Sequence, residues 1–226
     1  MEIDLDACYG FFFRAFVPDE RGVPVEVDDA PGFAEAEEAF VARVQEVLRG
    51  RPDLLEILSC VEGGLEVRLH CGSGFVDEDS EVYFYGSVQN EDEQLVLEIS
   101  TEEVLLGARA GHEVLDVVVH ELTHVLDHLQ DPQGVLPFMD REEIRELVRL
   151  REIELKKIDE GASCLDPYAK KNDMEFIAVA AETYFARPYE LATTSPKLFQ
   201  LLDRYFQVDP SEDAITMAAI KAVSPS

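Results

Sequence analysis

The sequence lacks several features that would place it in a specialised class of protein. No run of about 18 apolar residues occurs, so no segment is expected to cross a membrane. The four cysteines form no Cys-x-x-Cys pair, which excludes a zinc ribbon and a thioredoxin-like motif. The acidic first residues lead into no export signal, and no internal repeat is visible. We therefore expect a cytoplasmic protein whose thiols stay reduced.

Positive charge is also scarce. Lys and Arg number 19 against 48 Asp and Glu, which gives a formal net charge of −29. A surface this negative repels phosphate groups, so neither nucleic acid nor an anionic membrane is an expected partner. A solvated acidic coat is the simplest explanation of this charge, and the alternatives are attraction for basic substrates or life at high salt.

Apolar residues recur with strand-like spacing in the first part of the chain and with helical spacing later. Strands are expected over residues 10–17, 54–60, 65–71, 82–88 and 94–99, and one early helix over residues 33–48. Later helices are expected over residues 101–106, 112–130, 141–160, 173–186 and 196–206, with glycine or proline between most of them. This order predicts an α+β fold, with a small mixed sheet followed by a mainly helical C-terminal half.

These segments suggest one domain spanning residues 1–226. Residues 1–92 would supply part of the sheet and a backing helix, and residues 93–210 the active-site strand and helices. Residues 211–226 would form a tail. The strand expected over residues 94–99 could hold a substrate by strand addition if it lies at the sheet edge, and otherwise it is an ordinary core strand.

The strongest chemical signal is His120-Glu121-Leu122-Thr123-His124, which lies inside an apolar helical segment. Residues four apart share one face of a helix, so the two imidazoles can reach one ion. Zinc prefers such nitrogen ligands, and Glu121 is placed beside the ion to accept a proton from water. The sequence therefore predicts a catalytic zinc site.

A catalytic zinc ion needs a third protein ligand. His128 lies about 12 Å further along the helix, which is too far for one tetrahedral ion. Asp127 follows His124 on the same side and suits a carboxylate that orients a ligand histidine. Glu175 and Glu182 share one face of a later apolar helix, and either could bind the metal while the other supports it. Spacing alone does not choose between them.

Several segments together resemble a known family of zinc peptidases. They are Leu95–Ser100, Val118–Asp127, Leu165–Ala169, Glu175–Val179 with Glu182–Phe185 and Pro188, Tyr205-Phe206 and Asp209-Pro210. In this combination they resemble the Mlc titration factor A (MtfA) family, which is related to the catalytic domain of anthrax lethal factor. Ala181 and Ile177 depart from that pattern without touching the metal set. The first ninety or so residues match poorly.

The resemblance implies a zincin-like fold of the gluzincin type. It places Glu175 as the third zinc ligand, Tyr168 as the active-site tyrosine and Glu182 as a supporting carboxylate. It also implies hydrolysis of peptide or protein substrates, of the aminopeptidase type, with Glu121 as general base. The family's association with a transcriptional repressor suggests an alternative, in which the protein sequesters a regulatory partner and peptidase activity is incidental.

Overall fold

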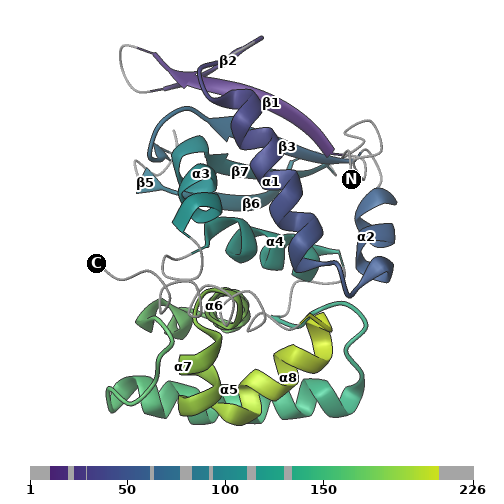
Figure 1. Ribbon diagram of the computed structural model, residues 1–226, viewed down its shortest axis with the longest axis vertical. Coiled ribbons are helices and arrows are strands. Elements are labelled where there is room, and N and C mark those ends of the chain that lie inside the picture. Colours follow the sequence, from purple (N-terminus) through teal and green to yellow (C-terminus); the bar gives the residue numbers. More distant parts are fainter. Residues whose placement is uncertain are drawn as a thin grey trace, which may run out of the picture.

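The structure is a computed structural model that describes residues 11–19, 23–28, 30–61, 64–76, 83–91, 94–110, 116–129 and 134–208. The tail expected over residues 211–226 lies outside these ranges. Figure 1 shows a sheet with helices against it in one half of the molecule and a group of helices in the other. Within the described residues, no helix combines the length and the apolar character that a membrane span requires.

Five strands form the main sheet in the order β2-β1-β3-β7-β6. Their bounds are Phe11–Pro18 for β1, Pro24–Val27 for β2, Leu65–His70 for β3, Gly86–Glu91 for β6 and Gln94–Ser100 for β7. The central β1, β3 and β7 run parallel, whereas β2 and β6 pair antiparallel at the two edges. A separate two-stranded sheet joins β4 (Phe75–Val76) and β5 (Tyr83–Phe84).

One face of the main sheet packs on helices. Its apolar side chains, such as Val67, Leu97 and Ile99, are fully buried and share one core with Phe40 of α1 (Phe33–Val47). The helix α3 (Thr101–Ala110) packs on α1, and α4 (Val117–His128) lies against both of them and against β6 and β7. The sheet therefore provides a rigid floor for α4, the helix that carries the two candidate histidines.

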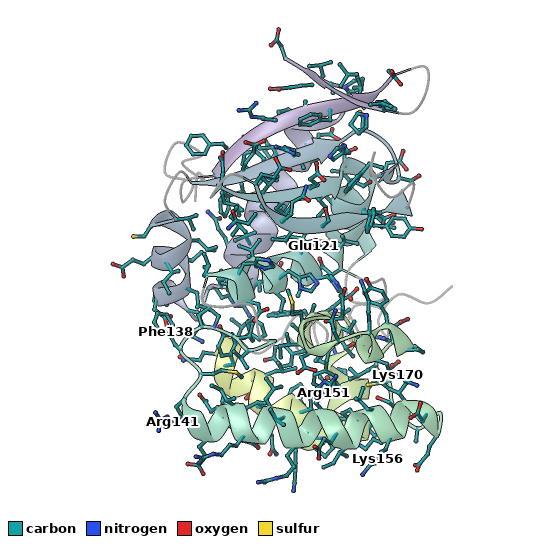
Figure 2. All side chains as sticks on the ribbon, turned by 180° about the vertical axis from the view of Figure 1, so that it is seen from behind. Glu121, Phe138, Arg141, Arg151, Lys156 and Lys170 are labelled. Atoms are coloured by element: carbon teal, nitrogen blue, oxygen red, sulfur yellow. The ribbon has the colours of Figure 1, made fainter. Side chains whose placement is uncertain are left out.

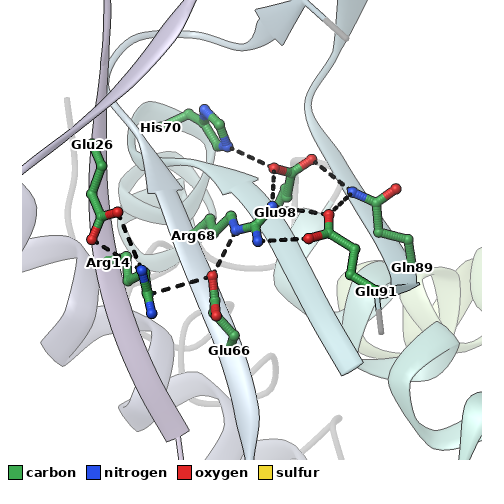
Figure 3. A network of polar contacts seen from close by, with 8 residues as sticks. All are labelled: Arg14, Glu26, Glu66, Arg68, His70, Gln89, Glu91 and Glu98. Atoms are coloured by element: carbon green, nitrogen blue, oxygen red, sulfur yellow. Dashed lines mark hydrogen bonds and ion pairs between the residues drawn. The ribbon is translucent and has the colours of Figure 1, made fainter. Parts of the chain in front are cut away.

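The opposite face of the sheet carries charge. Figure 3 shows Arg68 at its centre, where the guanidinium pairs with Glu66 at 2.7 Å, Glu91 at 2.8 Å and Glu98 at 3.4 Å. Arg14 adds pairs with Glu26 and Glu66. The alternation of side chains along each strand explains why one face is apolar and the other is an ion-pair network.

The helical half surrounds α6 (Asp173–Ala186), every residue of which is buried from Glu175 onward. The other elements there are α5 (Arg141–Asp159), the short 3₁₀ helix η3 (Pro167–Lys170), α7 (Pro188–Thr194) and α8 (Pro196–Phe206). Figure 1 shows α6 between the sheet half and the remaining helices. A helix that is apolar nearly all round must be covered on all sides, so the two glutamates on α6 are held in a dry environment.

The α+β expectation is confirmed: a small mixed sheet precedes a helical C-terminal half. The strand expected over residues 54–60 is wrong, because α2 spans Pro52–Ser59 there. Pro52 occupies the first helical turn, where proline is favourable, and Leu54 and Leu58 are buried on one face, four residues apart. The strand expected over residues 82–88 corresponds to two shorter strands, β5 and β6, and β2 lies where no strand was expected.

Candidate metal centre

The helix α4 is anchored at its first residue. Asp116 caps it, since its Oδ1 accepts a hydrogen bond from the Val119 amide at 3.1 Å. The other oxygen of Asp116 accepts from Arg43 Nε of α1 at 2.7 Å. Burial of Val118, Leu122 and other apolar side chains then fixes the rotation of the helix about its axis. The residues of the His-Glu-x-x-His motif consequently have defined directions.

His120 and His124 of α4 converge with Glu175 of α6. The two Nε2 atoms lie 3.2 Å apart, and each lies 3.2 Å from Glu175 Oε2. A tetrahedral ion with ligands at 2.0–2.1 Å requires its ligand atoms to be about 3.3–3.4 Å from one another. The triangle of two nitrogens and one oxygen therefore has the size of one face of a zinc coordination tetrahedron. The three side chains are one group that can hold a metal ion.

Glu175 is held from several sides. Asn172 caps α6 and accepts a hydrogen bond from the Glu175 amide at 2.8 Å, which fixes the backbone at this residue. The Oε1 atom of Glu175 accepts from the Tyr168 hydroxyl at 3.0 Å and from Lys171 Nζ at 2.8 Å. These contacts turn Oε2 toward the histidines. They thus orient one carboxylate oxygen for a ligand position.

Lys171 was not among the sequence-predicted site residues. Its ammonium also donates to the Tyr168 hydroxyl at 2.6 Å and lies 4.7 Å from the centre of that ring. The sequence did contain a signal for it, because Lys171 and Glu175 are four residues apart at a helix start. The Lys171 side chain is half exposed, so it forms the solvent side of the site.

Glu182 lies about two turns further along the same face of α6 as Glu175, as the spacing of seven residues requires. Its Oε2 is 3.3 Å from Nδ1 of His120, on the ring edge away from the metal position. A carboxylate at this point fixes the tautomer and the orientation of the imidazole. Asp127 has a different contact: its Oδ1 accepts from the Val135 amide at 3.0 Å. Among the described residues Nδ1 of His124 has no hydrogen-bond partner, so the predicted role of Asp127 in orienting a histidine stays a prediction.

Glu121 points from α4 toward β6. It is 5 % exposed, and its Oε2 has no hydrogen-bond partner among the described residues. Gly86, the first residue of β6, lies directly against it: a Cβ atom at Gly86 would come within 2.6 Å of Glu121 Oε1. Burial raises the pKa of Glu121 above its ordinary value. A buried carboxylate with a free oxygen is suited to accept a proton.

The charges around the triangle favour a cation. Burial opposes protonation of His120, but hydrogen bonds with Glu175 and Glu182 raise its pKa to about 10. Burial opposes ionisation of Glu175 as well, yet contacts with His120, His124 and Lys171 keep its pKa well below the usual range. The shift of His120 reflects the carboxylates around it, and the shift of Glu175 reflects the hydrogen-bond donors and positive charge that stabilise its ionised form.

Tyr168 stands at the mouth of the site. Asp166 caps η3 by accepting from the Tyr168 amide at 2.8 Å, and the tyrosine ring is half exposed. Its ring centre lies 6.2 Å from that of His120. Figure 2 places Glu121 between Phe138 on one side and Lys170, the residue two after Tyr168, on the other. The Tyr168 hydroxyl lies beside the metal ligands, since it donates to Glu175 Oε1 at 3.0 Å.

The strand next to the site differs from the expected one. Residues 94–99 belong to β7, which pairs with both β3 and β6 and is an interior strand. The edge strand beside α4 is β6, and within the described residues no further strand pairs with it. The possibility of strand addition on residues 94–99 is thereby excluded, and β6 is the strand with an open edge.

Comparison with known proteins agrees with this geometry. A model of the glucose-regulated metallo-peptidase M90 family matches residues 67–207, more than half of the chain. The chain belongs to this family. The matched segment includes α4, which carries the His-Glu-x-x-His motif, and α6, which carries Glu175. Membership indicates a metallopeptidase and hence a metal ion, for which the His/Glu group is a possible site.

Individual relatives are more distant. An uncharacterized protein of Synechocystis sp., slr2042, is 27 % identical over 150 residues, which cover 61 % of this chain and 51 % of that protein. Mlc titration factor A of Escherichia coli strain 55989 is 28 % identical over 104 residues, covering 42 % of this chain and 39 % of that protein. The resemblance to the MtfA family is confirmed. The matches span about half the length of these relatives or less.

Proposed function

We propose that this protein is a zinc-dependent peptidase whose metal ligands are His120, His124 and Glu175. The observation that carries the proposal is the triangle of ligand atoms with edges of 3.2 Å. Two imidazole nitrogens and one carboxylate oxygen form a common ligand set of catalytic zinc, which leaves a fourth position for water or substrate. An α+β fold with this ligand set supports the zincin-like, gluzincin type of organisation.

Zinc bound there would polarise the scissile carbonyl and lower the pKa of a water molecule at the open position. Glu121 supplies the general base, since the free Oε2 of its buried carboxylate can accept a proton from the attacking water. The same oxygen then delivers the proton to the departing amine. Glu182 keeps the His120 ring in the orientation that presents Nε2 to the ligand triangle.

Tyr168 and Lys171 act on the substrate carbonyl from the solvent side. The Tyr168 hydroxyl can donate a hydrogen bond to the carbonyl oxygen as negative charge builds up there. Lys171 donates to that hydroxyl at 2.6 Å, and this contact makes the phenol a better donor. The two residues thus supply positive potential where the transition state needs it.

The backbone of β6 offers a place for the peptide. An edge strand has unpaired amide and carbonyl groups, and an extended peptide can add to it as a further strand. Gly86 of β6 touches Glu121, so a peptide paired with β6 would pass the general base. Strand addition, expected first for residues 94–99, is therefore proposed for β6.

The decisive variant is Glu121→Gln. It should keep about one zinc ion per chain and reduce peptide cleavage by about 100-fold or more, because only the proton acceptor is lost. Metal analysis and a fluorogenic peptide panel measure both properties on one preparation. Glu152→Gln, an equivalent change on the exposed side of α5, is the control and should alter neither. Full cleavage by Glu121→Gln would refute the assignment.

A second candidate function rests on the relatives. Some of them bear the name Mlc titration factor A, which says of those proteins that they titrate Mlc. By analogy this chain would bind a regulatory protein, and its peptidase activity would be incidental. The Glu121→Gln variant separates the two candidates: a biological effect that survives in this variant supports binding, and one that is lost supports proteolysis.

A further inference from the structure

A cavity of about 560 Å³ lies at the far end of the edge strand from Glu121. Its lining includes Asn90 of β6, Leu95 of β7 and His128 at the end of α4, together with residues of α2 and Phe138. The two elements that meet at the catalytic residues, β6 and α4, therefore also meet at this cavity. Gly86 and Asn90 are four residues apart, about 13 Å along a strand.

The direction of the side chains connects the cavity to a bound peptide. Gly86 faces α4, because a Cβ there would meet Glu121, and Asn90 faces the same way since strand side chains alternate with a period of two. A peptide strand paired with β6 follows the same alternation. Its residue opposite Asn90 would lie four residues from the one opposite Gly86 and would point to the α4 side, where the cavity lies.

The chemistry of the cavity is specific. Its floor is apolar, with Ile57, Val61, Leu95 and Leu129, and α2 adds two carboxylates. Asp53 is paired with Arg51 at 2.7 Å, whereas the exposed Glu56 has no lysine or arginine partner among the described residues. No lysine or arginine lines it among the described residues. A long aliphatic side chain with a cationic head matches such a lining, since its stem packs on the floor and its charge reaches the Glu56 carboxylate.

Phe138, which lines the cavity, has an unusual backbone conformation. Its side chain is 56 % exposed, and its backbone adopts φ 64°, a left-handed conformation that costs energy for any residue other than glycine. Such strain persists where the surrounding structure enforces it and occurs often at ligand sites. The guanidinium of Arg51 already lies 5.9 Å from the centre of this ring, which shows that the ring accepts a cation.

We propose that this cavity is a specificity pocket for an arginine or lysine side chain about four residues from the scissile bond. The proposal rests on the proposed peptidase function, because it takes the bound strand on β6 as given. The proposal also connects the cavity with the strongly negative charge of the chain. That charge attracts a basic peptide, and the cavity then fixes the register of the bound peptide.

The test uses ten-residue quenched fluorescent peptides that share one cleaved bond. Arginine, norleucine or glutamate is placed four residues before that bond in one series and four residues after it in another. In one of the two series we expect a KM for the arginine peptide about five times lower than for norleucine, with kcat unchanged. This preference should shrink in 0.5 M NaCl, because the carboxylates are near the surface. Equal KM values for arginine and norleucine in both series would overturn the proposal.

Two variants locate the effect. Glu56→Gln should reduce the discrimination between arginine and norleucine, and Glu152→Gln, with the same change of net charge, should keep it. Phe138→Gly removes the ring while relieving the backbone, so a loss of discrimination in this variant cannot be attributed to a strained fold. Discrimination that both Glu56→Gln and Phe138→Gly retain in full would place the specificity elsewhere and contradict the proposal.

A binding assay distinguishes failure of the pocket from failure of the peptidase function. Zinc-loaded Glu121→Gln protein is titrated against the same peptides, without quencher, by fluorescence anisotropy. Tighter binding of the arginine peptide supports the pocket even if the wild-type protein cleaves nothing, an outcome that would refute only the proposed peptidase function. Cleavage without any preference, together with equal binding of all three peptides, would refute only the pocket.

Discussion

The charged face of the sheet and the metal centre both contain buried carboxylates, but they compensate them differently. On the sheet, Glu66 and Glu98 are paired with the guanidinium of Arg68, a permanent cation (Figure 3). The metal centre has three buried carboxylates, Glu121, Glu175 and Glu182. Among the described residues, Lys171 is the one lysine or arginine that pairs with any of them. The remaining positive charge must come from histidine protons or from a bound ion.

This difference explains why one cluster is structural and the other can be functional. Each carboxylate of the sheet network contacts Arg14 or Arg68, so each has a permanent cation beside it and needs no ligand. In the metal centre, Glu121 and Glu182 have no lysine or arginine partner among the described residues, and carboxylate contacts raise the pKa of His120. Carboxylate charge of this kind stabilises a proton on the ring, and a divalent cation can replace that proton. Variants in the two clusters should therefore affect different properties.

The largest effect is expected for Glu175→Gln, which removes the charged ligand. Metal affinity should fall by more than the roughly 100-fold that loss of a merely supporting residue costs. Zinc at about 1,000 times its wild-type Kd should stabilise the wild-type protein by about 4 kcal/mol and this variant by less than about 1.4 kcal/mol. Thermal unfolding with and without zinc measures the difference. Glu98→Gln on the sheet is the matched control, and a similar loss of the zinc effect there would contradict the comparison.

A change at the edge strand should separate metal binding from catalysis. Gly86→Ala introduces a Cβ within 2.6 Å of Glu121 Oε1, so the carboxylate must move. Displacement of a general base by about 1 Å costs about 100-fold in rate. Cleavage assays should show this loss, while metal analysis should still find one ion per chain. Wild-type activity in Gly86→Ala would mean that Glu121 does not need its present position.

A variant in the sheet network should change the free energy of unfolding and leave zinc affinity unchanged. Arg68→Met leaves Glu66 and Glu98 without their shared cation, and we expect a loss of about 3 kcal/mol, at the low end for broken buried pairs because Arg68 is partly exposed. Urea unfolding measures this loss. Zinc affinity, determined by competition with a chelating dye, should stay within about twofold of the wild type, and a larger change would show that the clusters are coupled.

The smallest effect on the metal is expected for Glu182→Gln. The amide oxygen can still accept from the His120 ring, but it lacks the charge, so zinc affinity should fall by about tenfold. The same dye competition measures it. If this variant lost zinc as completely as Glu175→Gln, Glu182 would be a direct ligand and the assignment of the two glutamates would be wrong.

The sequence predicted the parts of the site that lie on one helix. The spacing of His120 and His124 is a local property of α4, and the structure places both Nε2 atoms beside each other. The choice between Glu175 and Glu182 depended on the family resemblance, because both face the same way and only the packing of α6 on α4 distinguishes them. Direct proof of metal binding by these residues stays a matter for experiment.

The features that were missed depend on contacts between distant segments. Gly86 and Glu121 are far apart in sequence, and nothing in either segment shows that β6 rather than β7 is the open edge. The short apolar run of α2 fits both the strand and the helix period, which is why a strand is expected there, although Pro52 lies in the first turn of a helix. Strand order and edge exposure are tertiary properties that local patterns do not encode.

The most direct test of the central claim is zinc-edge X-ray absorption on protein loaded with one equivalent of zinc. Coordination by His120, His124 and Glu175 predicts a nitrogen and oxygen shell at about 2.0–2.1 Å, with imidazole scattering from two histidines and no sulfur. In Glu175→Gln the bound fraction should collapse. A sulfur shell at about 2.3 Å, or failure of the wild-type protein to hold one ion per chain, would contradict the account.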